Sequence, residues 1–273
     1  MEKRRKLNKE LINIIFIINM SDMVFREYLI SKCEKLKKPQ ERMIYNTKNK
    51  KVAVLVEPRE HEFLELVVRN VATILDDSWN IQIFTSNPEW CMKIFPDWRI
   101  KFVKLEFDNC TREQYSGLLM SKQFWELIHE EHILIFQTDC IFFKKGIDAF
   151  LEYDYIGPNY YAQQHVTPEG RGIQGGVSLR RRSAMIDCIE NVTYDIINKY
   201  RKEKGFPIMN DVIEDVYFTH ACEILGKNVA TREINKSFGI ECAYDYTINT
   251  HCHHGVNKPY FSIQDAMRLL ANS

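Results

Sequence analysis

From about residue 51 onward, short apolar runs alternate with longer segments whose apolar residues have helical spacing. The first run, KVAVLVE at 51–57, is rich in β-branched residues and predicts a buried parallel strand. Apolar residues between 63 and 75 then recur at helical spacing and predict a helix packed on that strand. Further strands are predicted at 81–86, 100–106 and 132–137, and helices at 88–95 and 118–128. This alternation predicts βαβ units and a parallel sheet.

The second half of the chain has a less regular pattern. Strands are predicted at 153–157 and 176–180, a helix at 183–200, and another from 210 to about 225. The polar loop at 159–172 is longer than most connections, which makes it a candidate substrate loop. The fold class predicted is α/β, with a mostly parallel central sheet flanked by helices.

Residues 1–50 differ from the rest in charge. Residues 1–51 hold 14 Lys and Arg against 6 Asp and Glu, in a chain with no net charge. The apolar stretch LINIIFIINM at 11–20 is about half the length of a membrane span and contains two asparagines. We therefore expect a basic helical extension at 1–50, no transmembrane segment, and one domain at 51–273. Contact of the extension with a membrane surface or a partner is the alternative.

Composition narrows the classes of function. The apolar and charged fractions, 45% and 27%, are ordinary for a globular protein. The acidic body that follows residue 51 argues against a nucleic-acid partner, because phosphate binding needs a basic surface. Eight cysteines without a CxxC pair are typical of reduced, buried thiols, and they predict a cytoplasmic protein.

Asp139 is the first candidate for chemistry. It follows the apolar strand predicted at 132–137 and precedes another apolar run at 141–143. Ligands of parallel sheets bind at the carboxyl ends of the strands, and a hard divalent cation on a diphosphate needs an oxygen ligand there. Asp139 is therefore a candidate metal ligand. A helix-capping or turn aspartate is the alternative.

Two further segments carry candidate contacts. GIQGGVSLRRR at 172–182 joins a glycine pair to a basic cluster, so that the backbone approaches a ligand closely and Arg180 meets a phosphate or a sugar hydroxyl. A tight turn before a strand is the alternative. Glu214 and Asp215 begin a predicted helix, and one of them is a candidate general base. The helix dipole alone also favours acids in a first turn.

Histidines gather near the carboxyl end. His251, His253 and His254 lie next to Cys252 and Gly255, and no second ligand pair with zinc spacing accompanies them. One imidazole is instead a candidate to complete the coordination of a cation held by Asp139. Surface histidines in a loop are the alternative.

The order of these segments resembles GT-A glycosyltransferases, in particular a poorly characterised glycosyltransferase-like family of large DNA viruses, bacteria and fungi. The resemblance covers about 51–260 and lies in the order of its blocks. The matching stretches are VAVLVEPR (52–59), YSGLLMSKQFWE (115–126), ILIFQTDCIFF (133–143), YDYIGPNY (153–160), IQGGVSLRRRSAM (173–185), IEDVYF (213–218), FGIEC (238–242) and HHGVNKP (253–259).

This resemblance implies a Rossmann-like GT-A fold and a role for each matching residue. Asp139 matches the last carboxylate of a DxD-like element whose first position is Gln137 here. His251 or His254 would complete the metal site, and Asp215 would be the general base, with Glu214 as the alternate. The donor would contact Val56, Glu57, Arg59, Tyr115, Lys122, Thr138, Asp139, Gly175, Gly176, Ser178 and Arg180.

The implied activity is transfer of a hexosyl or pentosyl group from a nucleotide sugar, a UDP-sugar foremost, to a hydroxyl of a glycan or protein-linked acceptor. Mn²⁺ or Mg²⁺ would stabilise the departing diphosphate, with inversion at the anomeric carbon. Retention and a metal-independent reaction are alternatives. A sugar nucleotidyltransferase and a non-catalytic sugar- or partner-binding module on the same fold are the rival functions. A viral member would act in the host cytoplasm or the virion, and the sequence leaves a homodimer open.

Overall fold

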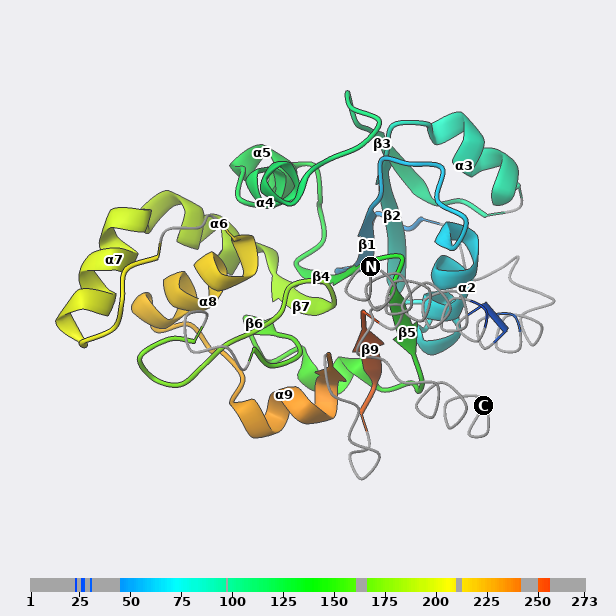
Figure 1. Ribbon diagram of the computed structural model, residues 1–273. Helices are drawn as coiled ribbons and strands as arrows, with labels where there is room; N and C mark the ends of the chain where they lie inside the picture. The colour runs from blue at the N-terminus through cyan, green and yellow to red at the C-terminus, as the bar shows by residue number, and fades with distance from the viewer. Residues whose placement is uncertain are drawn as a thin grey trace, which may run out of the picture.

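The computed structural model describes residues 45–96, 98–160, 166–209, 213–241 and 250–255, together with Met23, Arg26, Glu27 and Ile30 (Figure 1). Its elements in chain order are β1 (Lys51–Val56), α2 (Leu64–Ile74), β2 (Trp79–Thr85), α3 (Pro88–Ile94), β3 (Lys101–Lys104), α4 (Arg112–Leu119), α5 (Lys122–Glu126), β4 (His132–Phe136), β5 (Cys140–Phe142), the 3₁₀ helix η2 (Ile147–Phe150), β6 (Tyr155–Ile156), β7 (Ser178–Arg181), α6 (Arg182–Asn191), α7 (Tyr194–Glu203), α8 (Glu214–Ile224), α9 (Arg232–Phe238), β8 (Gly239–Ile240) and β9 (Cys252–His254).

The central sheet has six strands in the order β3-β2-β1-β4-β7-β6. β1 pairs in parallel with β2 and β4, and β2 pairs in parallel with β3. β7 runs antiparallel to β4, and β6 antiparallel to β7. The predicted α/β fold with a mostly parallel central sheet is therefore confirmed. The carboxyl ends of β1 and β4 meet at one edge, which is where ligands of such sheets bind.

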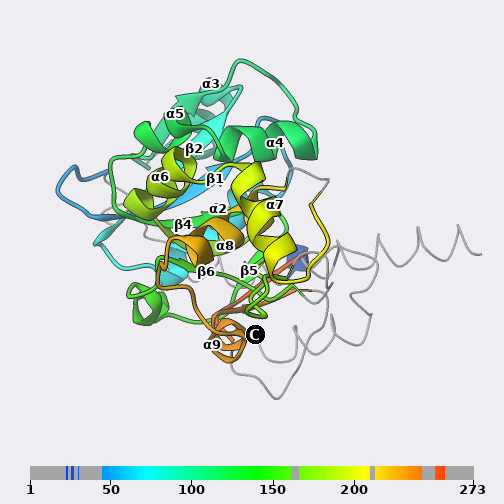
Figure 2. The same ribbon diagram turned by 90° about the vertical axis from the view of Figure 1, so that its left-hand side faces the viewer.

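Helices cover both faces of this sheet, as Figures 1 and 2 show. Successive side chains of a strand point to opposite faces, so β1 contributes to two apolar clusters. Ala53 and Leu55 belong to the cluster that includes residues of α2 and α3. Val52 and Val54 belong to the cluster that includes residues of α5, α6 and α8. The apolar run Val52–Val56 in β1 thus follows from its burial on both sides.

A second, smaller sheet holds the segment that follows β4. Its strand order is β5-β9-β8, and β9 runs antiparallel to β5 with Cys140 opposite His254. The Asn70 side chain on α2 accepts a hydrogen bond of 2.8 Å from the Phe142 N–H and donates one of 3.0 Å to the Phe142 carbonyl. Pairing with β9 and anchoring by α2 therefore fix the backbone immediately after Asp139.

Two helices that the sequence predicted as continuous are each divided in two. The prediction at 118–128 corresponds to the end of α4 and to α5, and the prediction at 183–200 to α6 and α7. Ser121 and Thr193 lie at the breaks, and each hydroxyl accepts a hydrogen bond from the N–H three residues on. Such N-caps begin a new helix. The apolar spacing continues past each break, which is why the sequence pattern predicted one helix where the structure has two.

Several predictions fall outside the described residues. They are the helix at 11–20 with most of the extension at 1–50, part of the candidate substrate loop at 161–165, and everything beyond 255. Within the described part of the chain, no helix combines the length and the apolar character needed to cross a bilayer.

Candidate active site

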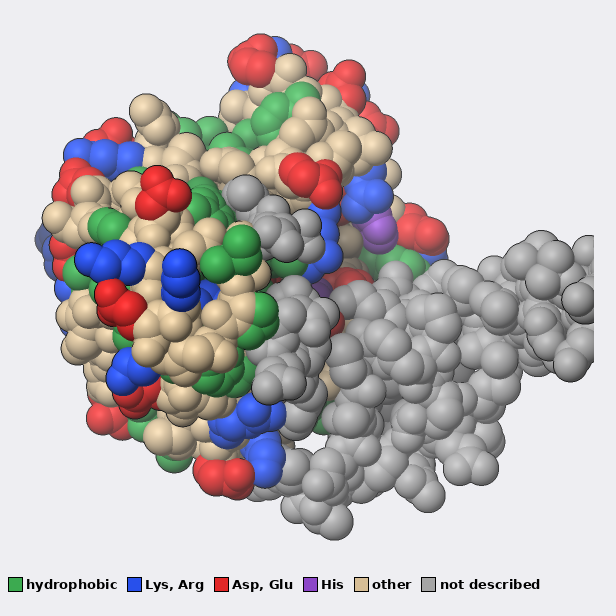
Figure 3. All heavy atoms as spheres, turned by 60° about the vertical axis from the view of Figure 1, so that its left-hand side comes forward, with side chains coloured by type: hydrophobic (Ala, Val, Ile, Leu, Met, Phe, Trp, Pro, Cys, Tyr) green, Lys and Arg blue, Asp and Glu red, His purple; other side chains and the backbone are tan. Residues whose placement is uncertain are grey.

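A pocket of about 430 Å³ opens at the carboxyl ends of β1 and β4, a volume typical of small-molecule sites. Its lining comes from the segment after β1, the start of α4 and the segment after β4. The described surface drawn in Figure 3 mixes basic and acidic side chains over that face. The residues that line the pocket are Val56, Glu57, Pro58, Arg59, His61, Asn109, Cys110, Thr111, Arg112, Tyr115, Gln137, Thr138 and Asp139.

Glu57 and Arg59 form one wall of this pocket as an ion pair. The Arg59 guanidinium donates to both Glu57 oxygens, with Nε to Oε1 at 2.7 Å and Nη2 to Oε2 at 2.8 Å. Glu57 is buried, whereas half of the Arg59 side chain is exposed. The hydrogen bond that Arg59 donates to Glu57 is the largest cause of a raised pKa for Arg59. This pairing fixes a guanidinium in the pocket wall, and Glu57 balances its charge.

Asp139 meets His254 at the end of β4. The imidazole Nε2 of His254 lies 3.2 Å from Asp139 Oδ1 and 3.0 Å from Gln137 Oε1. On its other side, His254 Nδ1 lies 2.6 Å from Glu241 Oε2. Burial acts to lower the pKa of His254, but the charges and hydrogen bonds of Asp139 and Glu241 outweigh it and raise the pKa to about 10. A cation could replace the proton on Nε2 while Glu241 keeps the ring oriented.

The two glycines of the predicted turn make this arrangement sterically feasible. A Cβ on Gly176 would lie 2.1 Å from the His254 ring, and a Cβ on Gly175 would lie 2.3 Å from Glu214 Oε1. Neither gap admits a methyl group, so the backbone approaches the histidine on one side and the acidic pair on the other.

Arg180 and Glu214 form a buried ion pair behind Gly175. Arg180 Nη1 lies 2.8 Å from Glu214 Oε2, and Nη2 lies 3.1 Å from Oε1. Arg180 Nε donates to Ser178 Oγ at 2.8 Å, and Nη2 donates to the Gly175 carbonyl at 3.3 Å. The guanidinium also lies 4.9 Å from the Tyr155 ring centroid. Both Glu214 oxygens are therefore engaged by Arg180.

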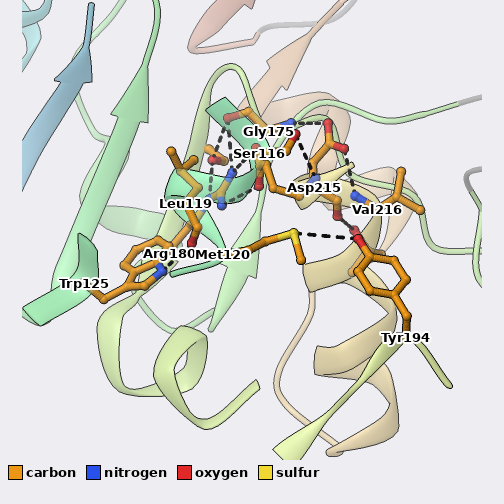
Figure 4. A network of polar contacts seen from close by, with 12 residues as sticks. Ser116, Leu119, Met120, Trp125, Gly175, Arg180, Tyr194, Asp215 and Val216 are labelled. Atoms are coloured by element: carbon orange, nitrogen blue, oxygen red, sulfur yellow. Dashed lines mark hydrogen bonds and ion pairs between the residues drawn. The ribbon is translucent and has the colours of Figure 1, made fainter. Parts of the chain in front are cut away.

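Asp215 binds the backbone N–H of Gly175 (Figure 4). Its Oδ2 accepts from the Gly175 N–H at 3.0 Å and its Oδ1 from the Val216 N–H at 2.8 Å. Burial, followed by the negative charge of Glu214, raises the pKa of Asp215 to about 7. A carboxyl group of that pKa exchanges a proton near neutral pH, as a general base must.

The chain matches the model of a known protein family. A family model described as "Protein of unknown function (DUF5672)" matches residues 97–254. The chain belongs to this family. The matched region contains Asp139, Gly175, Asp215 and His254, and it begins after β2. No curated protein matches.

Among solved structures, the mannosyltransferase PcManGT from Pyrobaculum calidifontis, in complex with GDP-Man and Mn²⁺, is similar to this DUF5672 chain. The identity is 14% and the TM-score 0.42, over 78% of this chain and 64% of that one. The DUF5672 chain thus spans less than two thirds of the length of that mannosyltransferase.

The structure brings together most of the residues that the sequence predicted as a site in this DUF5672 protein. Of the predicted residues, those that line the pocket are Val56, Glu57, Arg59, Tyr115, Thr138 and Asp139. Gly175, Gly176, Asp215 and His254 adjoin them through the contacts described above. Arg180 and Ser178 are fully buried and bind Glu214 and the Gly175 carbonyl, so they support the turn from behind.

Two predicted site residues lie elsewhere. The Lys122 ammonium on α5 is 2.6 Å from Glu190, and Lys122 does not line the described pocket. The His251 ring contacts Phe150 edge-on, and its Nδ1 lies 2.9 Å from the Ser237 carbonyl. Side chains alternate along β9, so His251 and His254 point to opposite faces. We therefore retain His254 alone as the candidate histidine ligand.

Sequence reasoning assigned no role to Cys140 and Glu241, which adjoin Asp139 and His254. Cys140 directly follows Asp139, and the pairing of β5, β9 and β8 brings it opposite His254 and brings Glu241, which follows β8, to the same place. Each strand has three residues or fewer, which is too short for a periodic signal. His61 and Arg112 in the pocket lining were also missed, because they lie in polar segments without a motif.

Proposed function

We propose that this protein is a GT-A-type glycosyltransferase that moves a sugar from a nucleoside-diphosphate sugar to a hydroxyl acceptor. One observation carries the proposal. The pocket at the sheet edge ends at the Asp139–His254 pair, and the Gly175–Gly176 turn links this pair to a buried carboxyl group on Asp215 with a pKa of about 7. Donor binding, charge stabilisation and proton transfer need these three features side by side.

The residues around Asp139 fit a divalent cation. Asp139 offers a carboxylate oxygen and His254 offers Nε2 at 3.2 Å from it, close to the spacing of two ligands on one ion. Glu241 orients the ring through Nδ1, as outer carboxylates do for histidine ligands. A divalent cation such as Mn²⁺, when bound here, would neutralise charge on the departing diphosphate.

The chain's own residues account for binding of the donor. Arg59 and Arg112 supply guanidinium donors to the pocket, which suit phosphate oxygens. Val56 and Tyr115 supply apolar surface for a base or ribose. We propose uracil as the nucleobase of the donor, so that the donor is a UDP-sugar.

Asp215, and not Glu214, is the proposed general base. Both oxygens of Glu214 bind Arg180, so the pair is held as a fixed charge. Asp215 would take the proton of the acceptor hydroxyl as that oxygen attacks the anomeric carbon. A single displacement of this kind inverts the anomeric configuration.

A thermal-shift screen tests the proposal. We expect one nucleoside diphosphate or nucleotide sugar to raise the Tm in the presence of a divalent cation, and Asp139→Asn to abolish the cation-dependent part of that shift. Lys122→Ala, which changes a residue outside the pocket lining, should leave the shift unchanged.

Product analysis completes this test. Incubation with the stabilising donor and candidate acceptors should release a nucleoside diphosphate, and Asp215→Asn should reduce the rate about 10²-fold or more without loss of donor binding. Donor binding without turnover by any acceptor would favour a binding module. Release of pyrophosphate from a nucleoside triphosphate and a sugar phosphate would favour a nucleotidyltransferase.

A further inference from the structure

Three described side chains near the end of β4 offer an oxygen, a sulfur and a nitrogen atom as possible metal ligands. A carboxylate oxygen of Asp139, Sγ of Cys140 and a ring nitrogen of His254 all lie within 4.8 Å of one another. Cys140 and His254 face each other across the β5–β9 ladder. The sulfur is therefore a fixed part of the cluster.

Surrounding backbone groups hold this sulfur in place. The Gln137 N–H donates to Cys140 Sγ at 3.3 Å, and Sγ lies 3.6 Å from the Gly176 carbonyl. Burial, followed by the negative charge of Asp139, raises the pKa of the Cys140 thiol well above its ordinary value, so the metal-free site holds a thiol whose proton a bound cation would displace. Gly176 also contacts His254, so one backbone segment positions both the sulfur and the imidazole.

This donor set differs from the one that Mg²⁺ requires. Mg²⁺ binds oxygen ligands in octahedral geometry, whereas imidazole and thiolate favour borderline transition metals. We propose that the site takes a divalent transition-metal ion of the Zn²⁺ or Co²⁺ type, with Cys140 as a ligand beside Asp139 and His254, in preference to Mg²⁺. The inference rests on the proposed function only for the presence of a cation at this position.

The binding step is a simple exchange. Bonds from Cys140 Sγ and His254 Nε2 to the metal ion would form as the S–H and Nε2–H bonds break and both protons pass to the buffer, with no change in oxidation state. Glu241, at 2.6 Å from His254 Nδ1, keeps the neutral ring turned with Nε2 toward the ion.

Titration of the metal-free full chain with Co²⁺ alone, in the absence of any sugar nucleotide, tests this assignment. The wild type should show visible d–d bands and a near-ultraviolet sulfur-to-cobalt charge-transfer band. Cys140→Ser should lose the charge-transfer band, keep the d–d bands, and bind Co²⁺ at least about tenfold more weakly, because even outer partners of metal ligands contribute that much. Cys91→Ser, which changes a buried thiol on α3, should retain both features. A large excess of Mg²⁺ should not displace the cobalt.

Two results would overturn the assignment of Cys140 as a ligand, and only one of them would also bear on the proposed transferase. Cobalt binding without a charge-transfer band in the wild type, or with the same band in Cys140→Ser, removes Cys140 from the site and leaves the proposed transferase intact. No cation binding of any kind removes the metal from both proposals. The wild-type spectrum alone decides the role of sulfur if Cys140→Ser does not fold.

Discussion

Single residues set the closest approaches in this site. His254 is buried, and its ring lies so close to Gly176 that a methyl group added at Gly176 would clash with it. Glu214 and Gly175 have the same relation on the other side of the turn. The two glycines therefore determine the distance between the cation ligands and the candidate base, although neither offers a functional group.

Replacing Gly176 by alanine should displace His254. We expect a folded variant with about 10- to 100-fold weaker Co²⁺ affinity, comparable to the loss of an outer-shell partner. Isothermal titration against the wild type measures this. Gly117→Ala is the matched control, because its Cβ would meet nothing within 4 Å on the exposed face of α4. That control should gain about 0.5–1 kcal/mol in free energy of unfolding. Equal cation affinity in both variants would contradict the steric argument.

Asp215 should make stability depend on pH. Burial raises its pKa from the ordinary 3.8 to about 7, so the folded protein holds this proton more tightly than the unfolded chain. The contribution to stability is complete below pH 3.8 and is lost as the pH rises to about 7, by roughly 4 kcal/mol at most. Denaturant unfolding of the wild type and of Asp215→Asn at several pH values should show the wild type losing stability relative to the variant over that interval. Parallel curves would show that Asp215 has an ordinary pKa.

At the scale of elements, helices α6 and α7 show that the local apolar pattern does not predict where a helix ends. Their apolar positions continue one stripe, but Val192 leaves the helical conformation and Thr193 caps the next helix. The Tyr217 hydroxyl on α8 donates to the Cys188 and Val192 carbonyls at this break, at 2.9 and 2.7 Å. A side chain from a third helix thus stabilises the end of α6, which no local pattern predicts.

Removal of the Thr193 cap should weaken α7. Its hydroxyl accepts a hydrogen bond from the Ile196 N–H at 3.3 Å on an exposed surface. Thr193→Ala should lower the free energy of unfolding by about 1 kcal/mol, whereas Thr193→Ser should retain most of it. Denaturant titration distinguishes the two, and equal losses would assign the effect to packing of the methyl group.

The Arg180–Glu214 pair joins β7 to α8 inside the protein. Removing one partner leaves a buried charge, so Arg180→Met should lower the free energy of unfolding by about 3–5 kcal/mol. The double variant Arg180→Met/Glu214→Leu should lose less than that single variant, because no charge stays unpaired. Lys199→Met, at an exposed pair with 4.0 Å between Lys199 and Glu203, should change stability by less than about 1 kcal/mol. A double variant at least as unstable as the single one would refute this account.

At the scale of the whole molecule, the centre of the main sheet could be predicted from the sequence because β1 and β4 are local apolar runs. The end of β4 could be predicted as a site for the same reason, since the topology brings Asp139 to the ligand-binding edge. The resemblance favoured Asp215 over Glu214, but the physical reason for that choice could not be predicted, because it depends on Arg180, 34 residues away from Glu214. The pairing of Cys140 with His254 depends on two short strands far apart in the chain.

The contact between Asn70 and Phe142 has a consequence for how this protein meets other chains. β5 is the outer strand of the small sheet, and such strands expose backbone groups that invite pairing with another molecule. The amide of Asn70 engages the N–H and the carbonyl of Phe142 together, as a neighbouring strand would. One asparagine on α2 thereby protects this edge from self-association, next to a site that has to stay open to solvent.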